Sequence, residues 1–424
     1  MINSSHHAAL KLLESIIAQG KNLDNALNSR IFTDMELRDK KFVRQILMVT
    51  LRHWGIIDKI LENFMERPLP KKDIRTQLLL SLGTAHLLWM GTPDYAAVNS
   101  MVELAKQTGA HRHTGLINAV LKAVANGGDE LLYTLDKEIL SLPEWLWKRW
   151  VKQYGEDTTR EIIRAQMQIP PLDLSPKESI AQLKALLPEG EILPQGSLRL
   201  HEAGMVNNLA GFNEGQWWVQ DAAAAIPALL FGEVKGKHIY DLCAAPGGKT
   251  AQLAAKGAQV TAVDLSESRI KRLKENLARL ELSAQCICAD LDKWQAPAVD
   301  AVLLDAPCSA TGTLRRHPDL AWKKTAPDIK ELAEIQSNLL KRAALWVKSG
   351  GILIYATCSL EPEEGEMQIE KFLKNQPEFK LVPIEAQEVG DASFIKDGML
   401  RTLPCFLAEK GGMDGFFAAR MIRS

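Results

Sequence analysis

The strongest constraint on the fold is an alternation of strand and helix patterns from about residue 232 onward. Short apolar runs are each followed by a stretch with helical spacing, which is typical of a doubly wound α/β sheet. In such sheets, ligands bind at the carboxyl ends of the strands. The expected strand ends carry polar side chains, namely Asp241, Asp264, Asp290, Asp305 and the pair Thr357-Cys358.

The chain before this region divides into two further segments. Residues 1–140 place apolar side chains at helical spacing, with Gly, Pro and Asn clusters between them, so we expect an all-α domain. Residues 141–231 mix short apolar runs with prolines and glycines, which indicates a small α+β module with a linker. Residues 232–424 form the α/β domain. A length of 424 residues is consistent with this multidomain organisation.

Composition excludes several classes of protein. Apolar residues make up 46% of the chain and charged residues 24%, as in a globular protein that does not span a membrane. The first ten residues lack the pattern of a signal peptide, so we expect a cytoplasmic protein. The net charge of −1 does not indicate nucleic-acid binding, so any RNA surface must be a local basic patch. None of the six cysteines forms a C-x-x-C pair, so we expect no metal.

A glycine-containing turn at residues 241–250 predicts the cofactor site. Gly248-Lys249-Thr250 matches the end of a P-loop, but Cys243 stands where the first P-loop glycine belongs. A cofactor with an adenosine and no phosphates fits the turn better. An acidic residue at the end of the next strand, here Asp264, accepts hydrogen bonds from ribose hydroxyls. Asp290 has the same place on the third strand and is expected at the adenine. The competing interpretation is that these aspartates only cap the helices that follow.

Two cysteines are expected at the rim of the same pocket. Cys308 follows the fourth strand in Asp305-Ala306-Pro307-Cys308-Ser309, and Cys358 follows the fifth in Thr357-Cys358-Ser359. An unreactive cysteine is usually buried among apolar side chains. These two lie at strand-to-loop junctions beside polar residues, which favours a chemical role for at least one of them. The residue pattern alone does not rank the two.

Together, the motifs at 241–250, 305–309 and 357–359 closely resemble those of the RNA 5-methylcytosine methyltransferase family, in its RsmB branch. The helical N-terminal segment resembles the RNA-binding antitermination factor NusB. The resemblance covers nearly the whole chain and is densest over residues 217–360. It implies a class I, Rossmann-like methyltransferase domain that acts on a cytosine-967 type site of 16S ribosomal RNA. It also implies a monomer that binds small-subunit ribosomal RNA and no DNA.

The same resemblance assigns roles to individual residues. Cys358 is the implied nucleophile, Cys308 helps to release the product, and Asp305 and Lys249 assist catalysis. The methyl donor is S-adenosyl-L-methionine. The residues expected to bind it are Cys243, Ala244, Ala245, Pro246, Gly247, Gly248, Lys249, Asp264, Asp290 and Asp305.

Covalent catalysis explains why this chemistry needs a thiolate. Carbon 5 of cytosine is a poor nucleophile, and a thiolate that adds to carbon 6 makes carbon 5 reactive. The target base must also leave its stack to reach the pocket. We expect residues 1–140, the middle module and the basic stretch 315–324 to contact the RNA.

One departure and two alternatives qualify this interpretation. Many relatives have a Leu-Arg-Val-Asn strand where this chain has Leu172-Asp173-Leu174-Ser175, which places a substrate contact by that strand in doubt. One alternative is a class I methyltransferase that modifies an amine or amide, which would need no cysteine. The other is a non-catalytic RNA-binding assembly factor, which would have lost the cofactor turn or a cysteine.

Overall fold

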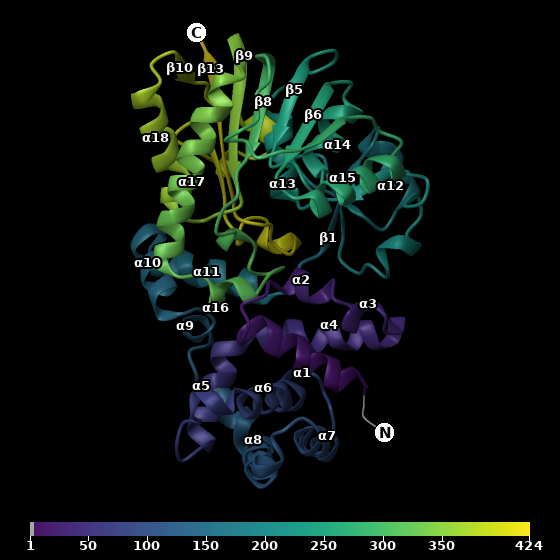
Figure 1. Ribbon diagram of the computed structural model, residues 1–424, viewed down its shortest axis with the longest axis vertical. Coiled ribbons are helices and arrows are strands. Elements are labelled where there is room, and N and C mark those ends of the chain that lie inside the picture. The colour runs from purple at the N-terminus through teal and green to yellow at the C-terminus, as the bar shows by residue number, and fades with distance from the viewer. Residues whose placement is uncertain (1–3) are drawn as a thin grey trace. The chain divides into compact units, whose positions relative to one another are not determined.

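A computed structural model describes residues 4–424 and divides them into two compact units (Figure 1). The first unit extends to Met167 and also includes Leu314–Lys324. The second comprises Gln168–Thr313 and Thr325–Ser424. This division differs from the expected boundaries at residues 140 and 231, because the middle segment contributes helices to the first unit and strands to the second. Within residues 4–424, no helix is long and apolar enough to cross a membrane.

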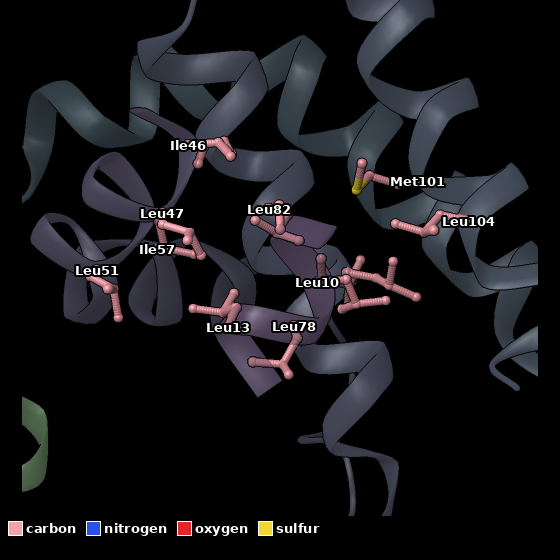
Figure 2. Close-up of a cluster of buried hydrophobic side chains, with 14 of the residues drawn as sticks. Leu10, Leu13, Ile46, Leu47, Leu51, Ile57, Leu78, Leu82, Met101 and Leu104 are labelled. Carbon is pink, nitrogen blue, oxygen red and sulfur yellow. The ribbon is translucent and has the colours of Figure 1, made fainter. Parts of the chain in front are cut away.

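The first unit contains only helices in the part that the structure describes, as predicted. Its helices are α1 (Ser4–Ile17), α2 (Leu23–Leu27), α3 (Arg30–Thr33), α4 (Leu37–Arg52), α5 (Trp54–Phe64), α6 (Ile74–Trp89), α7 (Asp94–Gln107), α8 (Thr114–Thr134), α9 (Lys137–Leu140), α10 (Glu144–Tyr154), α11 (Glu156–Met167) and α16 (Asp319–Lys323). Leucines at helical spacing fill the core, and Leu13, Leu47 and Leu78 meet there from α1, α4 and α6 (Figure 2). Apolar burial of this kind is the main stabilising term for such a bundle.

Helix α8 continues past the point where the sequence predicts its end. The run Asn126-Gly127-Gly128 favours termination near Ala125, but α8 continues to Thr134. A β-carbon on Gly128 would lie 3.1 Å from Leu88 Cδ2, so glycine permits close packing of α8 on α6. Here tertiary packing outweighs the low helix propensity of glycine.

Part of the basic stretch 315–324 is buried within the first unit, while its other basic side chains are partly exposed. Arg315 is fully buried, and its carbonyl accepts a 3.0 Å hydrogen bond from the Arg52 guanidinium. The buried Asp319 carboxylate accepts one from the Leu23 backbone N–H at 3.0 Å, and the Trp322 indole donates to the Leu51 carbonyl at 3.3 Å. The stretch is therefore part of the packing of the first unit.

The second unit begins with a small antiparallel sheet of order β2-β3-β1-β4, which confirms the α+β module. Its elements are β1 (Leu172–Pro176), α12 (Ile180–Leu186), β2 (Glu191–Ile192), β3 (Leu198–Leu200) and β4 (Trp217–Val219). Asp173 on β1 pairs with Arg199 on β3 at 2.7 Å, with both side chains fully buried. Arg199 also donates to the carbonyls of Lys410 and Gly412. Asp173, which stands where many relatives have an arginine, therefore has a structural role.

A nine-stranded sheet forms the rest of the second unit, with the order β11-β12-β13-β9-β8-β5-β6-β7 and β10 paired to β13. Strands β5 to β9 are parallel, and β13 lies antiparallel to β9. The strands are β5 (His238–Leu242), β6 (Gln259–Asp264), β7 (Gln285–Cys288), β8 (Val299–Asp305), β9 (Val347–Thr357), β10 (Phe379–Leu381), β11 (Ile395–Lys396), β12 (Met399–Thr402) and β13 (Phe416–Arg423). The accompanying helices are α13 (Ala222–Leu229), α14 (Gly248–Ala255), α15 (Glu267–Arg279), α17 (Ala326–Leu345), α18 (Glu366–Asn375) and α19 (Ala386–Val389). The predicted doubly wound sheet is confirmed.

We expect Asp173→Ala to destabilise the protein by about 3–5 kcal/mol, because it leaves the Arg199 guanidinium buried without its ion-pair partner. Chemical denaturation followed by tryptophan fluorescence measures the change. The control is Lys348→Ala, which removes the solvent-exposed ion pair with Asp300 and should cost less than about 1 kcal/mol. Equal effects of the two substitutions would contradict the assigned role of Asp173.

Candidate active site

The candidate site lies where the strand order of the large sheet reverses. Strands β6 and β7 follow β5 on one side, and β8 and β9 lie on the other. In doubly wound sheets, the crevice beyond the carboxyl ends of the two central strands is the usual ligand site. Strand β5 ends at Leu242 and β8 at Asp305, so the turn at 243–247 and the loop at 306–310 flank this point.

The turn after β5 folds tightly before α14 begins at Gly248. Cys243 and Gly247 both have positive φ angles, of 62° and 101°. At Gly247, a β-carbon would also approach Leu273 Cγ to 2.9 Å, so both backbone conformation and space require glycine there. Thr250 in the first turn of α14 donates a 2.5 Å hydrogen bond to Asp241 Oδ2, which ties the helix to the end of β5.

The acidic side chains on the next two strands lie in different surroundings. Asp264 is buried, and its carboxylate accepts hydrogen bonds from the backbone N–H groups of Ala245 at 3.2 Å and Ser266 at 3.1 Å. Asp290 is partly exposed and accepts one from the Asp292 N–H at 3.0 Å. Both therefore make local bonds within turns, but neither is a helix cap as the competing interpretation expects, because Ser266 caps α15 and the element after β7 is strand β8. Asp264 additionally joins the β6 end to the turn after β5.

Lys249 and Asp305 form an ion pair across the reversal point. Lys249 Nζ lies 2.8 Å from Asp305 Oδ2, with the lysine side chain 9% exposed and the aspartate 31% exposed. The ammonium also lies 4.9 Å from the centre of the Phe416 ring on β13. Low exposure strengthens such contacts relative to those in water. The aspartate is thus held by a cation while part of it stays accessible.

The two cysteines at the ends of β8 and β9 are in direct contact. Cys308 Sγ and Cys358 Sγ lie 3.4 Å apart, and both side chains are partly exposed. The hydrogen bond with Cys358 raises the pKa of the Cys308 thiol well above its usual range, and burial and the charges of Cys358 and Glu364 add to this. Two thiolates at this distance repel each other, so the pair holds one negative charge at most near neutral pH.

Comparison with known proteins assigns the family. The profile described as 16S rRNA methyltransferase RsmB/F matches residues 228–422, and the NusB family profile matches residues 3–126. Ribosomal RNA small subunit methyltransferase B of Vibrio cholerae is 36% identical, with 97% of this chain and 96% of that protein covered. The chain belongs to the RsmB/F family. The protein of the same name from Pasteurella multocida is 34% identical, with 99% and 96% covered.

Solved structures agree with this fold. The crystal structure of PH0851 aligns with a TM-score of 0.78 at 24% identity and covers 98% of this RsmB/F chain and 99% of that chain. A methyltransferase homologue from Pyrococcus horikoshii aligns with a TM-score of 0.55 at 25% identity, with 70% and 98% covered. The first alignment includes both units of the RsmB/F chain and the second a smaller share.

Two further titratable groups of this RsmB/F protein lie beside the turn. Burial raises the pKa of the Cys243 thiol to about 12, with the charge of Asp264 as the next cause. Cys243 is therefore a neutral thiol at physiological pH and unsuited to be a nucleophile. Burial also raises the pKa of Asp241 to about 7, although the Thr250 hydroxyl opposes this. Asp241 Oδ1 is buried and has no hydrogen-bond partner among the described residues.

The polar groups behind the two cysteines were not predicted from the sequence. Ser309 and Ser359, which directly follow Cys308 and Cys358, both bond to the buried carboxylate of Glu364. The available signal was the acidic run Glu361-Pro362-Glu363-Glu364 immediately after the Thr-Cys-Ser motif. A run of three acids is usually a solvated surface, and only the fold shows that Glu364 is fully buried.

The raised pKa of Asp241 predicts a pH-dependent loss of stability. The folded protein holds the Asp241 proton more tightly than the unfolded chain does. At pH values below the unfolded pKa, the carboxyl group therefore does not lower the free energy of unfolding. The loss in free energy of unfolding grows as pH rises from about 4 to about 7. At 1.36 kcal/mol per pKa unit, it approaches about 4 kcal/mol. Asp241→Asn removes this cost. The free energy of unfolding of the variant minus that of wild type should therefore rise over this pH range.

Denaturation at several pH values measures this difference. The matched control is Asp300→Asn. The backbone N–H of His238 lowers the pKa of Asp300, so its effect on stability changes with pH only below about 4, and its difference from wild type should stay nearly constant between about pH 4 and 7. A difference between Asp241→Asn and wild type that stays constant with pH would refute the burial cost of Asp241.

Proposed function

We propose that this RsmB/F family protein transfers a methyl group from S-adenosylmethionine to carbon 5 of a cytosine in small-subunit ribosomal RNA, through a covalent bond between a cysteine and carbon 6. The observation that carries the proposal is the contact between two thiols at adjacent strand ends, beside a lysine–aspartate pair. The relatives from Vibrio cholerae and Pasteurella multocida, named as ribosomal RNA small subunit methyltransferases, support the substrate.

The residues at the ends of β5, β6 and β7 fit an adenosine-bearing cofactor. The turn has small side chains at Ala244, Ala245, Gly247 and Gly248, which let a ligand approach the backbone. Asp264 would hold the ribose and Asp290 the adenine. When bound, the cofactor supplies an electrophilic methyl group.

The cysteines and Asp305 would carry out the chemistry on the base. The Cys358 thiolate adds to carbon 6, and the ring nitrogen, where negative charge develops, takes up a proton from solvent. The Asp305 carboxylate then accepts hydrogen bonds from that ring N–H and from the exocyclic amine. Lys249 keeps Asp305 in place and adds positive charge. After methylation, the Cys308 sulfur accepts the proton from carbon 5, and the bond between Cys358 and carbon 6 breaks.

The raised pKa of Cys308 fits its role in this division. While Cys358 is a thiolate, its charge and hydrogen bond hold Cys308 in the protonated form. Once Cys358 is bonded to carbon 6, that charge is gone and Cys308 can lose its proton. A thiol with a raised pKa is also the stronger base when it is ionised. Cys358 therefore suits the attack, and Cys308 suits the release.

The first unit supplies a reason to expect RNA as the substrate. Its match to the NusB family covers residues 3–126. NusB was described above as an RNA-binding antitermination factor. Helix α4 exposes Arg38, Lys41 and Arg44 on its outer face. Basic side chains of this kind bind phosphates without sequence preference.

Asp264→Ala should weaken binding of S-adenosylmethionine by about ten-fold to a hundred-fold, because hydrogen bonds to a charged acceptor contribute about 1.5–3 kcal/mol. Isothermal titration calorimetry measures the affinity, and circular dichroism shows whether the variant is folded. The control is Asp292→Ala, which changes an exposed aspartate two residues past Asp290. Unchanged affinity in a folded Asp264→Ala protein would remove Asp264 from the cofactor site.

Single substitutions of the two cysteines should give different products. Cys358→Ala cannot form the covalent bond and should abolish methyl transfer. Cys308→Ala should still attack and methylate but fail to release, so that protein accumulates on RNA. A denaturing gel should show a slow-migrating RNA-dependent band for Cys308→Ala only, and bisulfite sequencing of the ribosomal RNA reads the methylation.

Cys405→Ala, which changes a cysteine outside the two motifs, is the control and should behave as wild type. A band from Cys358→Ala instead would exchange the two roles. Full activity of both variants without any band would reject the covalent mechanism and favour an amine or amide methyltransferase. Absence of methylation by the wild-type protein would favour a non-catalytic assembly factor.

A further inference from the structure

One buried carboxylate contacts both of the loops that carry the paired thiols. Glu364 ends a short 3₁₀ turn (Pro362–Glu364) and is fully buried. Its Oε1 accepts a hydrogen bond from the Ser309 backbone N–H at 2.9 Å, and its Oε2 accepts from the Ser309 hydroxyl. The same Oε2 accepts from the Ser359 hydroxyl at 2.5 Å. The carboxylate therefore bridges the residues immediately after Cys308 and Cys358.

We propose that Glu364 is the positioning residue that holds the Cys308 and Cys358 thiols in contact. It acts through its hydrogen bonds to Ser309 and Ser359 and not through a hydrogen bond to either sulfur. The inference rests on the proposed function, since it assigns Glu364 a role in the cysteine chemistry of that same site.

Three further side chains donate hydrogen bonds to Glu364. The Gln336 side-chain amide on α17 donates to Glu364 Oε1 at 2.9 Å and to the Pro307 carbonyl at 2.9 Å. The hydroxyls of Tyr355 and Thr357 on β9 donate to the Glu364 backbone carbonyl at 2.9 and 3.1 Å. A buried carboxylate with this many donors keeps one position, and a fixed acceptor fixes the loops that donate to it.

Further hydrogen bonds join the same two loops. The Gly312 N–H donates to the Cys358 carbonyl at 3.0 Å, and the Leu360 N–H donates to Thr311 Oγ1 at 3.0 Å. The Ser309 and Ser359 hydroxyls also lie 3.1 Å apart, and both of them bond to Glu364. Glu364 is the group that contacts the residue next to each cysteine, so its loss should let the two sulfur atoms separate.

The charge of Glu364 has a second effect on the same pair. It lies close enough to Cys308 to contribute to the raised pKa of that thiol. A negative charge on this side disfavours a Cys308 thiolate while Cys358 is still free. The same carboxylate that bonds to both loops thus also helps to keep the Cys308 thiol protonated.

The test compares Glu364→Gln, Ser309→Ala and the control Glu370→Gln, an exposed glutamate on α18, in the full-length protein. The first measurement needs no RNA. It is the rate at which diamide, which takes up two electrons and two protons, converts the Cys308 and Cys358 thiols to a disulfide, read by peptide mass spectrometry. Disulfide formation requires close and specific sulfur geometry. We expect it to be at least about ten-fold slower in Glu364→Gln and several-fold slower in Ser309→Ala.

The second measurement is steady-state methyl transfer to ribosomal RNA. A displacement of about 1 Å at a reacting group costs about a hundred-fold in rate. We expect kcat of Glu364→Gln to fall by about ten-fold to a hundred-fold, with the KM for RNA within about two-fold of wild type. Calorimetry with S-adenosylmethionine should show unchanged affinity, and Glu370→Gln should match wild type throughout. A merely structural role would change KM, cofactor affinity and kcat together.

Wild-type disulfide rates in both Glu364→Gln and Ser309→Ala would overturn the inference. If Glu364→Gln does not fold, Ser309→Ala decides alone, because it removes one hydroxyl and leaves the carboxylate in place. Failure of the proposed function is distinguishable from failure of the inference. In that case the wild-type protein would form no RNA adduct and transfer no methyl group, while the disulfide rates would still report on Glu364.

Discussion

The reversal of strand order between β5 and β8 is the constraint on which the candidate site depends. Parallel strands place their carboxyl ends at one edge of the sheet, and the chain leaves that edge in opposite directions on the two sides of the reversal. The turn with Gly247 and the loop with Cys308 therefore open away from each other. The ion pair between Lys249 and Asp305 spans the space between them. Residues far apart in sequence meet because the sheet has this topology.

Hydrogen bonds between buried polar groups fix the positions of the side chains at that edge of the sheet. Unpaired polar atoms in a protein interior cost free energy, so the hydroxyls and carboxylates behind the site must find partners. Asp264 accepts bonds from two backbone N–H groups, and Glu364 accepts them from two serines and a glutamine. Asp241 Oδ1 has no partner among the described residues, and the pKa of that carboxyl is correspondingly raised. The network holds the thiols and the turn while leaving parts of Asp305 and Cys358 accessible.

The loop after β8 is restrained on both sides of Gly312. Before it, Ser309 bonds to Glu364; at Gly312 itself, a β-carbon would lie 2.0 Å from the Gly415 carbonyl oxygen, so the two glycine backbones pack directly together. The segment Leu314–Lys324 belongs to the first unit, where Arg315 and Asp319 are buried among its helices. The first unit is therefore not a simple appendage that can be deleted, because its packing includes a segment from the catalytic half of the sequence.

The amino-acid sequence by itself determined the helical first unit, the small α+β module, the doubly wound sheet and the family, because hydrophobic periodicity and short motifs are local properties. It also located the residues of the candidate site, including the turn at 241–250 and both cysteines. The end of α8, the burial of Arg315 and the pairing of Asp173 with Arg199 were decided only by tertiary structure, because each depends on a partner distant in sequence. The contact of Cys308 with Cys358 and its support by Glu364 were decided in the same way. The acidic run at residues 361–364 has the composition of a surface segment, but Glu364 is buried at the centre of a hydrogen-bond network. Burial depends on the whole fold and not on the local sequence.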